Sequence, residues 1–175
     1  SIKMFSNIIK ALKNPEKAFR FIKFMLKYRL RKKKGILIYL GMDPAGTFNL
    51  MYNGFEKCYG FEPNPIRFNK IKNKYKNNKN IFLYNAAVST YDGEVVLNIS
   101  SNNNGASSSI GNFDNNWHEK YATKKIVMVN NITVPCINLV NFIKANNIEN
   151  IEEYVSDIQG MDLEVLKTLK PLIDQ

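Results

Sequence analysis

The chain of 175 residues is long enough for one compact domain, and two full domains would leave too few residues for either core. Its composition, with 45% hydrophobic and 23% charged residues, is that of a soluble globular protein, and no apolar run approaches the roughly 18 residues of a membrane span. The net charge of +10 favours an anionic partner. The two cysteines, Cys58 and Cys136, form no CxxC pair, which excludes a disulfide framework and a zinc site, so no metal is expected.

The excess positive charge lies entirely at the beginning of the chain. Residues 1–34 contain 12 Lys and Arg and one acid, a net charge of +11, whereas residues 35–175 contain 13 Lys and Arg and 14 acids, a net charge of −1. Because this leaves the rest of the chain nearly neutral, we divide it into a basic helical extension over 1–34 and a domain over 35–175. The extension lacks an apolar leader with a cleavage site, which predicts a cytoplasmic location.

The extension is predicted to form two amphipathic helices, over residues 2–13 and 15–30. Apolar residues recur at three- and four-residue spacing, the helical period. These residues are Phe5, Ile8, Ile9, Leu12, Phe19, Ile22, Met25 and Leu26. Asn14-Pro15 separates the two helices, because Asn caps a helix whose first residue is Pro15.

From Gly35 onward, segments typical of strands alternate with segments typical of helices. Bounded apolar runs predict strands over 36–40, 57–61, 81–84, 94–99, 126–129, 132–137 and 154–158. Helices are predicted over 65–76, 138–145 and 162–169, the last ended by Pro171, and the Asn- and Ser-rich segment 100–116 is predicted to be a loop. This alternation favours an α/β fold of Rossmann-like type, with a mostly parallel sheet flanked by helices.

A glycine-containing turn follows the first strand, and an acid ends the second. The turn runs from Gly41 through Asp43 to Gly46, and Glu62 lies 21 residues after Gly41. This spacing is close to that between the glycine turn and the ribose-binding acid of dinucleotide-type folds. A carboxylate in that place can accept hydrogen bonds from two vicinal ribose hydroxyls. An ordinary turn can have the same glycine spacing, so this pattern alone leaves the ligand open.

The segment Phe61-Glu62-Pro63-Asn64-Pro65 is more specific. Pro63 stops the strand, Asn64 can cap a helix and Pro65 starts it, which would fix Glu62 at the edge of the sheet. This FEPNP sequence after an apolar strand resembles the FkbM family of methyltransferases, which use S-adenosylmethionine (SAM). Further similarity lies in Asn85-Ala86-Ala87-Val88-Ser89, in Ser107-Ser108-Ser109-Ile110 and in residues 156–166, in the order of the family and over residues 36–170.

The resemblance implies a class I, Rossmann-like fold that binds SAM as its cofactor. By analogy, Gly41 and the backbone near Asp43 would border the methionine part of SAM, and Glu62 would hold the ribose. The complete set of implied cofactor-binding residues is Gly41, Asp43, Gly46, Glu62, Pro63, Asn64 and Ala87, with Ala87 beside the adenine.

Two residues are candidates for a catalytic base. The resemblance places Asp157 at the carboxyl end of its strand, facing the methyl group and the acceptor; the alternative is a helix-capping carboxylate without a catalytic role. His118, the single histidine, lies in a polar segment and is the second candidate.

The chain also departs from the family pattern. Tyr39-Leu40-Gly41 stands where the family commonly has an acid at the end of the first strand, and Ser156 stands where a lysine is usual. The chain ends at Gln175, shortly after the helix that follows Asp157, where related folds add strands, so a domain truncated at its C-terminus is expected. A degenerate fold that no longer binds cofactor is therefore an alternative to an enzyme.

The resemblance implies SAM-dependent O-methylation of a hydroxyl on a small molecule, sugar or glycan. Three interpretations remain for residues 1–34. They bind nucleic-acid phosphates, they lie on an anionic lipid surface and make the protein peripheral to a membrane, or they pack their apolar face on the domain with the lysines in water. The sequence does not indicate the acceptor or the oligomeric state.

Overall fold

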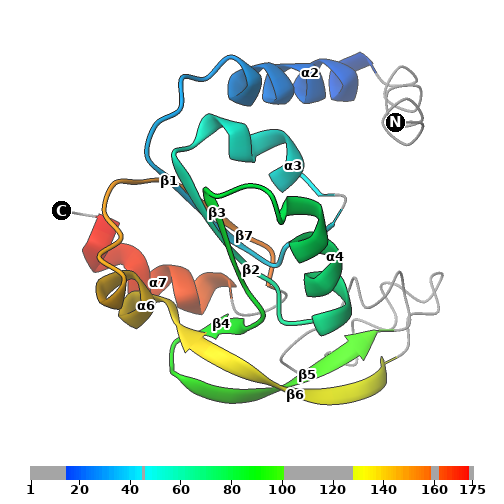
Figure 1. Cartoon of the computed structure of the whole chain (residues 1–175), viewed down its shortest axis with the longest axis vertical. Helices are drawn as coiled ribbons and strands as arrows, with labels where there is room; N and C mark the ends of the chain where they lie inside the picture. Colours follow the sequence, from blue (N-terminus) through cyan, green and yellow to red (C-terminus); the bar gives the residue numbers. More distant parts are fainter. Residues whose placement is uncertain (1–14, 45, 101–127, 159–161, 174–175) are drawn as a thin grey trace.

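The computed structural model describes residues 15–44, 46–100, 128–158 and 162–173 (Figure 1). Outside these ranges lie the expected helix over 2–13, nearly all of the expected loop over 100–116, Ser107 to Ile110, and His118.

Strands and helices alternate along the domain. The strands are β1 (Ile36–Leu40), β2 (Lys57–Phe61), β3 (Ile81–Tyr84), β4 (Ala87–Ser89), β5 (Gly93–Ser100), β6 (Met128–Asn138) and β7 (Ile151–Ser156). The helices are α2 (Pro15–Arg29), α3 (Phe48–Met51), the 3-10 helix η1 (Tyr52–Gly54), α4 (Pro65–Tyr75), α6 (Leu139–Ala145) and α7 (Asp162–Ile173).

The described strands form two sheets. The first has the order β3-β2-β1-β7, and every neighbouring pair is parallel. The second has the order β4-β6-β5, with β4 parallel and β5 antiparallel to β6. The second sheet lies beyond the carboxyl ends of β2 and β3 (Figure 1). The predicted α/β fold, with a mostly parallel sheet between helices, is confirmed.

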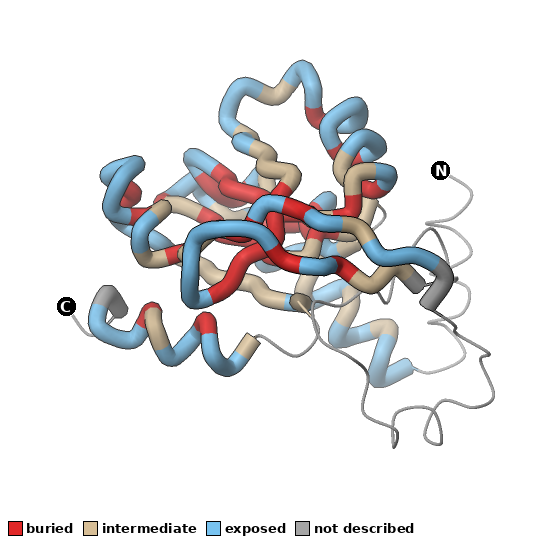
Figure 2. The backbone as a smooth tube through the Cα atoms, turned by 90° about the horizontal axis from the view of Figure 1, so that it is seen from below, coloured by how far each residue is buried: buried red, intermediate tan, exposed pale blue. Residues whose placement is uncertain are grey.

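Helices cover both faces of the first sheet because β1 is apolar along its whole length. Successive side chains of a strand point to opposite faces. Leu37 and Tyr39 therefore pack with α2, α3, η1 and α4, whereas Ile38 and Leu40 pack with α6 and α7. Figure 2 shows the buried residues concentrated in these central strands. A strand that is buried on both faces has a continuous apolar sequence, which explains why β1 could be predicted from the sequence.

The structure corrects three predicted boundaries. The two strands predicted around Asn130-Asn131 are one, because the antiparallel ladder continues through these exposed asparagines opposite Asn98 and Ile99. β7 spans Ile151–Ser156 rather than residues 154–158, since Ile151 pairs with Ile36 and Ser156 pairs with Leu40. Pro171 does not end α7, which continues to Ile173. A proline this close to a helix end removes one hydrogen bond of the last turn and leaves the preceding turns intact.

Helix α2 has the predicted bounds to within one residue, but the side that packs on the domain is not the apolar face identified from the spacing. Tyr28 is 2% exposed and joins the core with the partly buried Phe24. Three members of the apolar face predicted from the spacing, Phe19, Ile22 and Leu26, are instead exposed. None of the helices in the described ranges has the length and apolar character needed to cross a bilayer.

Candidate functional site

Three residues singled out from the sequence lie together where the parallel strands end. Gly41, Glu62 and Asp157 each directly follow the last residue of β1, β2 and β7. The register pairs Leu40 with Phe61 and with Ser156, so these three residues stand side by side across the sheet. We call this row the carboxyl edge. Ligands of open α/β sheets bind outside this edge.

The turn after β1 requires a glycine at its first position. Gly41 has φ +72°, and a Cβ atom there would lie 2.1 Å from the backbone oxygen of Asp157. The amides of Gly41 and Met42 both donate to the Phe61 oxygen, at 3.0 and 3.2 Å, and the Asp157 amide donates to the Leu40 oxygen at 3.2 Å. The missing side chain therefore allows three strand ends to approach closely.

The Glu62 side chain is fixed by the residues that follow it. Only 6% of Glu62 is exposed, and its Oε1 accepts a hydrogen bond from the Asn64 amide at 2.8 Å. The Asn64 side chain in turn accepts from the amides of Ile66 at 3.0 Å and Arg67 at 3.4 Å, which caps α4 as the FEPNP sequence predicted. Asn64 therefore both caps α4 and holds the Glu62 carboxylate through its backbone amide.

Arg67 joins both sides of this site and was missed in the sequence analysis. Its Nε lies 3.6 Å from Oε2 of Glu62, and its NH2 lies 3.9 Å from Oδ2 of Asp43. The same NH2 donates to the Met42 oxygen at 3.3 Å. One signal was available: Arg67 lies in the first turn of α4, where the helix dipole disfavours a cation, so an anionic partner was to be expected.

Burial dominates the ionisation of Glu62. Removal from water raises the pKa of Glu62 from its ordinary value of 4.5 to about 7, against the lowering influence of the Asn64 amide and the Arg67 guanidinium. The Asp43 carboxylate adds a smaller raising effect. Glu62 therefore changes protonation state near neutral pH, which is a property that perturbed groups at functional sites often have.

Asn85 connects the end of β3 to the same site. Its side-chain amide donates to the backbone oxygens of Glu62 at 2.9 Å and Pro63 at 3.0 Å. Ala87, two residues later, is 2% exposed and pairs with Cys136 in the second sheet. The turn after β1 is closed by a backbone hydrogen bond, which the Gly46 amide donates to the Asp43 oxygen at 2.9 Å.

Asp157 is exposed at the carboxyl edge, whereas a different acid orders the connection to α7. The Asp162 carboxylate accepts hydrogen bonds from the Ser156 hydroxyl and from the Ile158 amide, the latter at 3.1 Å. Asp157 precedes the first residue of α7 by five positions. Among the described residues, Asp162 therefore orders the start of α7, and the catalytic role of Asp157 stays a prediction.

The Tyr39 side chain, near the end of β1, lies in the core rather than at the carboxyl edge. Its hydroxyl lies 2.7 Å from the Thr47 hydroxyl, and its ring packs edge-on against Phe48 at 5.4 Å. It belongs to the core beneath α3. The carboxylates near the turn are therefore supplied by Asp43 and Glu62.

A hollow in the domain lies away from the carboxyl edge. It has a volume of about 730 Å³ between β7, α6 and α7 and is lined by Ile143, Asn147 and Tyr154, among others, and by no residue of the carboxyl edge. Among the described residues, no three His, Cys, Asp or Glu side chains lie close enough to hold a metal ion.

A comparison with protein-family models agrees with the α/β fold. The model of the methyltransferase FkbM domain matches residues 42–175, which is most of the chain. No curated relative and no solved structure shows significant similarity to the chain.

Proposed function

Because this chain belongs to the methyltransferase FkbM family, we propose that it binds SAM at the carboxyl edge and methylates a hydroxyl group of a small molecule, sugar or glycan. The observation that carries the proposal is the buried Glu62 carboxylate at the end of β2. It stands next to the glycine turn of β1, the arrangement that holds a ribose in dinucleotide-type folds.

The residues of the site have the chemistry that SAM needs. Oε1 of Glu62 accepts one bond from Asn64, and a carboxylate has about four acceptor positions, which leaves capacity for the two ribose hydroxyls. The methionine part carries a cationic amine and a sulfonium. Asp43, with its side chain 45% exposed, and the exposed Asp157 place negative charge at the same edge.

Bound SAM would supply an electrophilic methyl group. Within this chain, the Glu62 carboxylate would orient the cofactor, and Asp157 would take the proton that the acceptor hydroxyl loses as its oxygen is methylated. Positioning contributes strongly to such a displacement, so the fixed geometry of Glu62 matters for rate as well as affinity. His118 remains the second candidate for the base.

Calorimetric titration with SAM and with S-adenosylhomocysteine tests the cofactor site. Glu62→Gln keeps the shape of the side chain but loses the negative charge, and we expect it to weaken binding at least about tenfold. Glu56→Gln is the matched control, because Glu56 is exposed just before β2, and it should bind like the parent. Absence of binding to the parent chain would refute cofactor binding and favour the degenerate fold.

The acceptor requires a separate assay. Transfer of labelled methyl groups to mixtures of sugars, glycans and small hydroxylated metabolites would identify the substrate class. Asp157→Asn should lower the rate of transfer by a larger factor than it weakens cofactor binding, because it removes the proposed base as well as one nearby negative charge. Transfer to nitrogen or carbon acceptors alone would contradict O-methylation.

A further inference from the structure

Helix α2 has two apolar faces, and only one of them packs on the domain. The inner face carries Tyr28, which is buried, and Phe24, which is partly buried. The outer face is a stripe of four exposed apolar side chains, spaced three, four and four residues apart and therefore aligned on one side of the helix. This outer stripe consists of Phe19 (69% exposed), Ile22 (49%), Leu26 (46%) and Leu30 (77%), the last just after α2.

The inner face is held by aromatic packing. The rings of Phe24 and Tyr28 meet edge-on at 4.8 Å, and the Phe55 ring lies 6.1 Å from that of Tyr28. The Arg31 guanidinium lies over the Phe55 ring at 4.6 Å and donates through Nε to the Gly54 oxygen at 3.0 Å.

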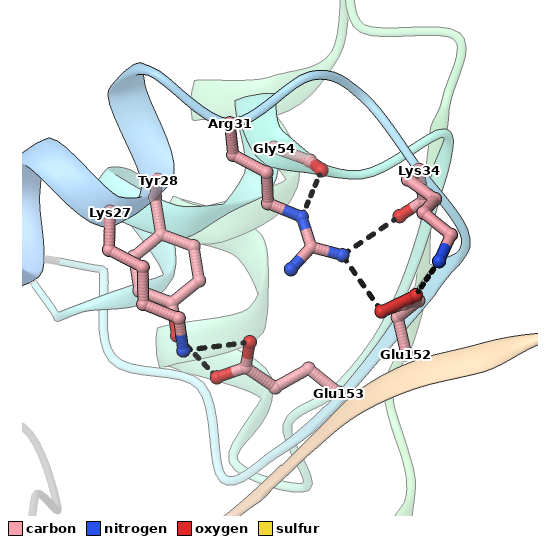
Figure 3. Close-up of polar contacts among 7 residues, drawn as sticks. All are labelled: Lys27, Tyr28, Arg31, Lys34, Gly54, Glu152 and Glu153. Carbon is pink, nitrogen blue, oxygen red and sulfur yellow. Dashed lines mark hydrogen bonds and ion pairs between the residues drawn. The ribbon is translucent and has the colours of Figure 1, made fainter.

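Two glutamates of β7 add a polar clamp at the end of α2 (Figure 3). Glu152 pairs with Arg31 at 3.1 Å and with Lys34 at 2.8 Å. Glu153 accepts from the Tyr28 hydroxyl and lies 3.5 Å from the Lys27 ammonium. Because packing and clamp together fix the rotation of α2 about its axis, the outer stripe is held facing outward, away from the described residues of the domain.

Cations accompany this stripe. Lys23, Lys27 and Arg31 line a shallow groove together with the four apolar residues, although Lys27 and Arg31 are also paired with the clamp glutamates. Arg29, Lys32 and Lys33 are exposed nearby, and the single acid of α2, Glu16, forms an ion pair with Arg20 at 2.9 Å. The outward surface is therefore both apolar and strongly basic.

We propose that the outer stripe of α2 docks on the surface of an anionic lipid bilayer. A helix of this kind lies in the interface, with its apolar side chains among the acyl chains and its cations at the lipid phosphates. Binding to nucleic acid would use the cations but leave four large apolar side chains in water, and a purely apolar protein partner would leave the excess cations unmatched. A lipid surface satisfies both features at once.

The location of α2 makes this docking compatible with the proposed cofactor site. The clamp lies at the amino end of the parallel sheet, since Glu153 pairs with Leu37 in the register of β7 and β1. Figure 1 shows α2 at the end of the molecule opposite the second sheet, which lies beyond the carboxyl edge. Docking through α2 therefore leaves the carboxyl edge accessible, and this inference stands whether or not SAM binds there.

Flotation of the full chain with vesicles tests the proposal. The parent chain should bind mixed vesicles of phosphatidylcholine and phosphatidylserine and should not bind phosphatidylcholine alone. Replacing both Ile22 and Leu26 by Gln, which keeps the helical propensity, should weaken binding to the mixed vesicles at least about tenfold. The matched control replaces the exposed Leu163 and Leu166 of α7 by Gln and should bind like the parent.

Three results would overturn the proposal. One is that the parent does not bind mixed vesicles; another is that the Ile22 and Leu26 variant binds them as the parent does. The third is that the parent forms a dimer in sedimentation experiments which the same variant abolishes, because the stripe would then be covered by a second copy. Circular dichroism of both double variants establishes that α2 and α7 remain folded.

Discussion

The Glu62 carboxylate and the Arg67 guanidinium face each other at 3.6 Å inside the protein, and neither side chain is more than 8% exposed. The separation between Nε and Oε2 is longer than a normal hydrogen bond, so the attraction is mainly between charges. Burial disfavours the ionised form of Glu62, whereas Arg67 favours it. The balance between these two effects decides how the site responds to pH and to substitution.

The raised pKa of Glu62 predicts that folding stability falls as pH rises. With a pKa of about 7 in the folded state and 4.5 in the unfolded state, the folded protein holds more protons between these values. The stabilisation is complete below the unfolded pKa and is lost as pH rises through the folded pKa, by at most about 3 kcal/mol. Urea unfolding should show this loss in the parent relative to Glu62→Gln, which does not titrate there. A difference between the two proteins that is constant with pH would contradict the prediction.

Arg67→Met should destabilise the protein most where Glu62 is ionised. The substitution removes the cation that lowers the pKa of Glu62, so this pKa moves further up, and the Met42 oxygen loses a donor. Breaking a buried pair costs about 3–5 kcal/mol when the remaining charge stays ionised, and less once it becomes protonated. The loss should therefore be larger at about pH 8 than at about pH 5. Combining it with Glu62→Gln should recover part of the loss, and a pH-independent loss would show that Arg67 acts only through packing.

Gly41→Ala should prevent the strand ends from meeting. Position 41 has φ +72°, and the new methyl group would lie 2.1 Å from the Asp157 oxygen, which belongs to the backbone and cannot rotate away. The unfavourable backbone conformation costs about 1–2 kcal/mol, and displacement of the Asp157 segment adds to it. Gly54→Ala is the control, because φ at position 54 is not positive and the nearest atom to its Cβ would be a side-chain carbon of Arg31, at 3.1 Å. Thermal unfolding should show a much larger decrease in midpoint for Gly41→Ala than for Gly54→Ala.

The parts of the fold that could be predicted are those whose local pattern matches their final environment. β1 is apolar throughout because it is buried on both faces, and FEPNP contains its own strand stop, cap and first helical residue. The contacts of Arg67 with Asp43 and Met42 could not be predicted from its sequence neighbourhood, since these two residues follow another strand. The orientation of α2 is likewise set by contacts with β7 and η1, far along the chain, so periodicity alone could not show which side of the helix packs on the domain.

Asn64→Ala tests how much the side-chain cap of α4 contributes to the free energy of unfolding. Loss of the two hydrogen bonds to the Ile66 and Arg67 amides should lower the free energy of unfolding by about 1 kcal/mol. Asn69→Ala is the control, because Asn69 is exposed within the same helix and alanine has the higher helical propensity. Urea unfolding should therefore rank Asn69→Ala at or above the parent and Asn64→Ala below it. Equal stabilities for the two variants would argue against the cap.

Glu152→Gln should release the end of α2 from the domain without unfolding the sheet. The Glu152 carboxylate holds Arg31 and Lys34, and these two cations keep its pKa below the ordinary value. Gln keeps the size but not the charge, so the segment from Arg31 to Lys34 should open more often and become a better substrate for trypsin. Glu149→Gln is the matched control, because Glu149 is exposed shortly before β7. Faster cleavage in Glu152→Gln alone, with little change in the thermal midpoint, is the expected result.

Protonation of Glu152 should have the same effect as the substitution. Cleavage of the parent by an acid-active protease that cuts after basic residues should therefore also accelerate as pH falls through the pKa of Glu152. Equal cleavage rates for the three proteins would show that aromatic packing of Tyr28 on Phe55 fixes α2 without the clamp.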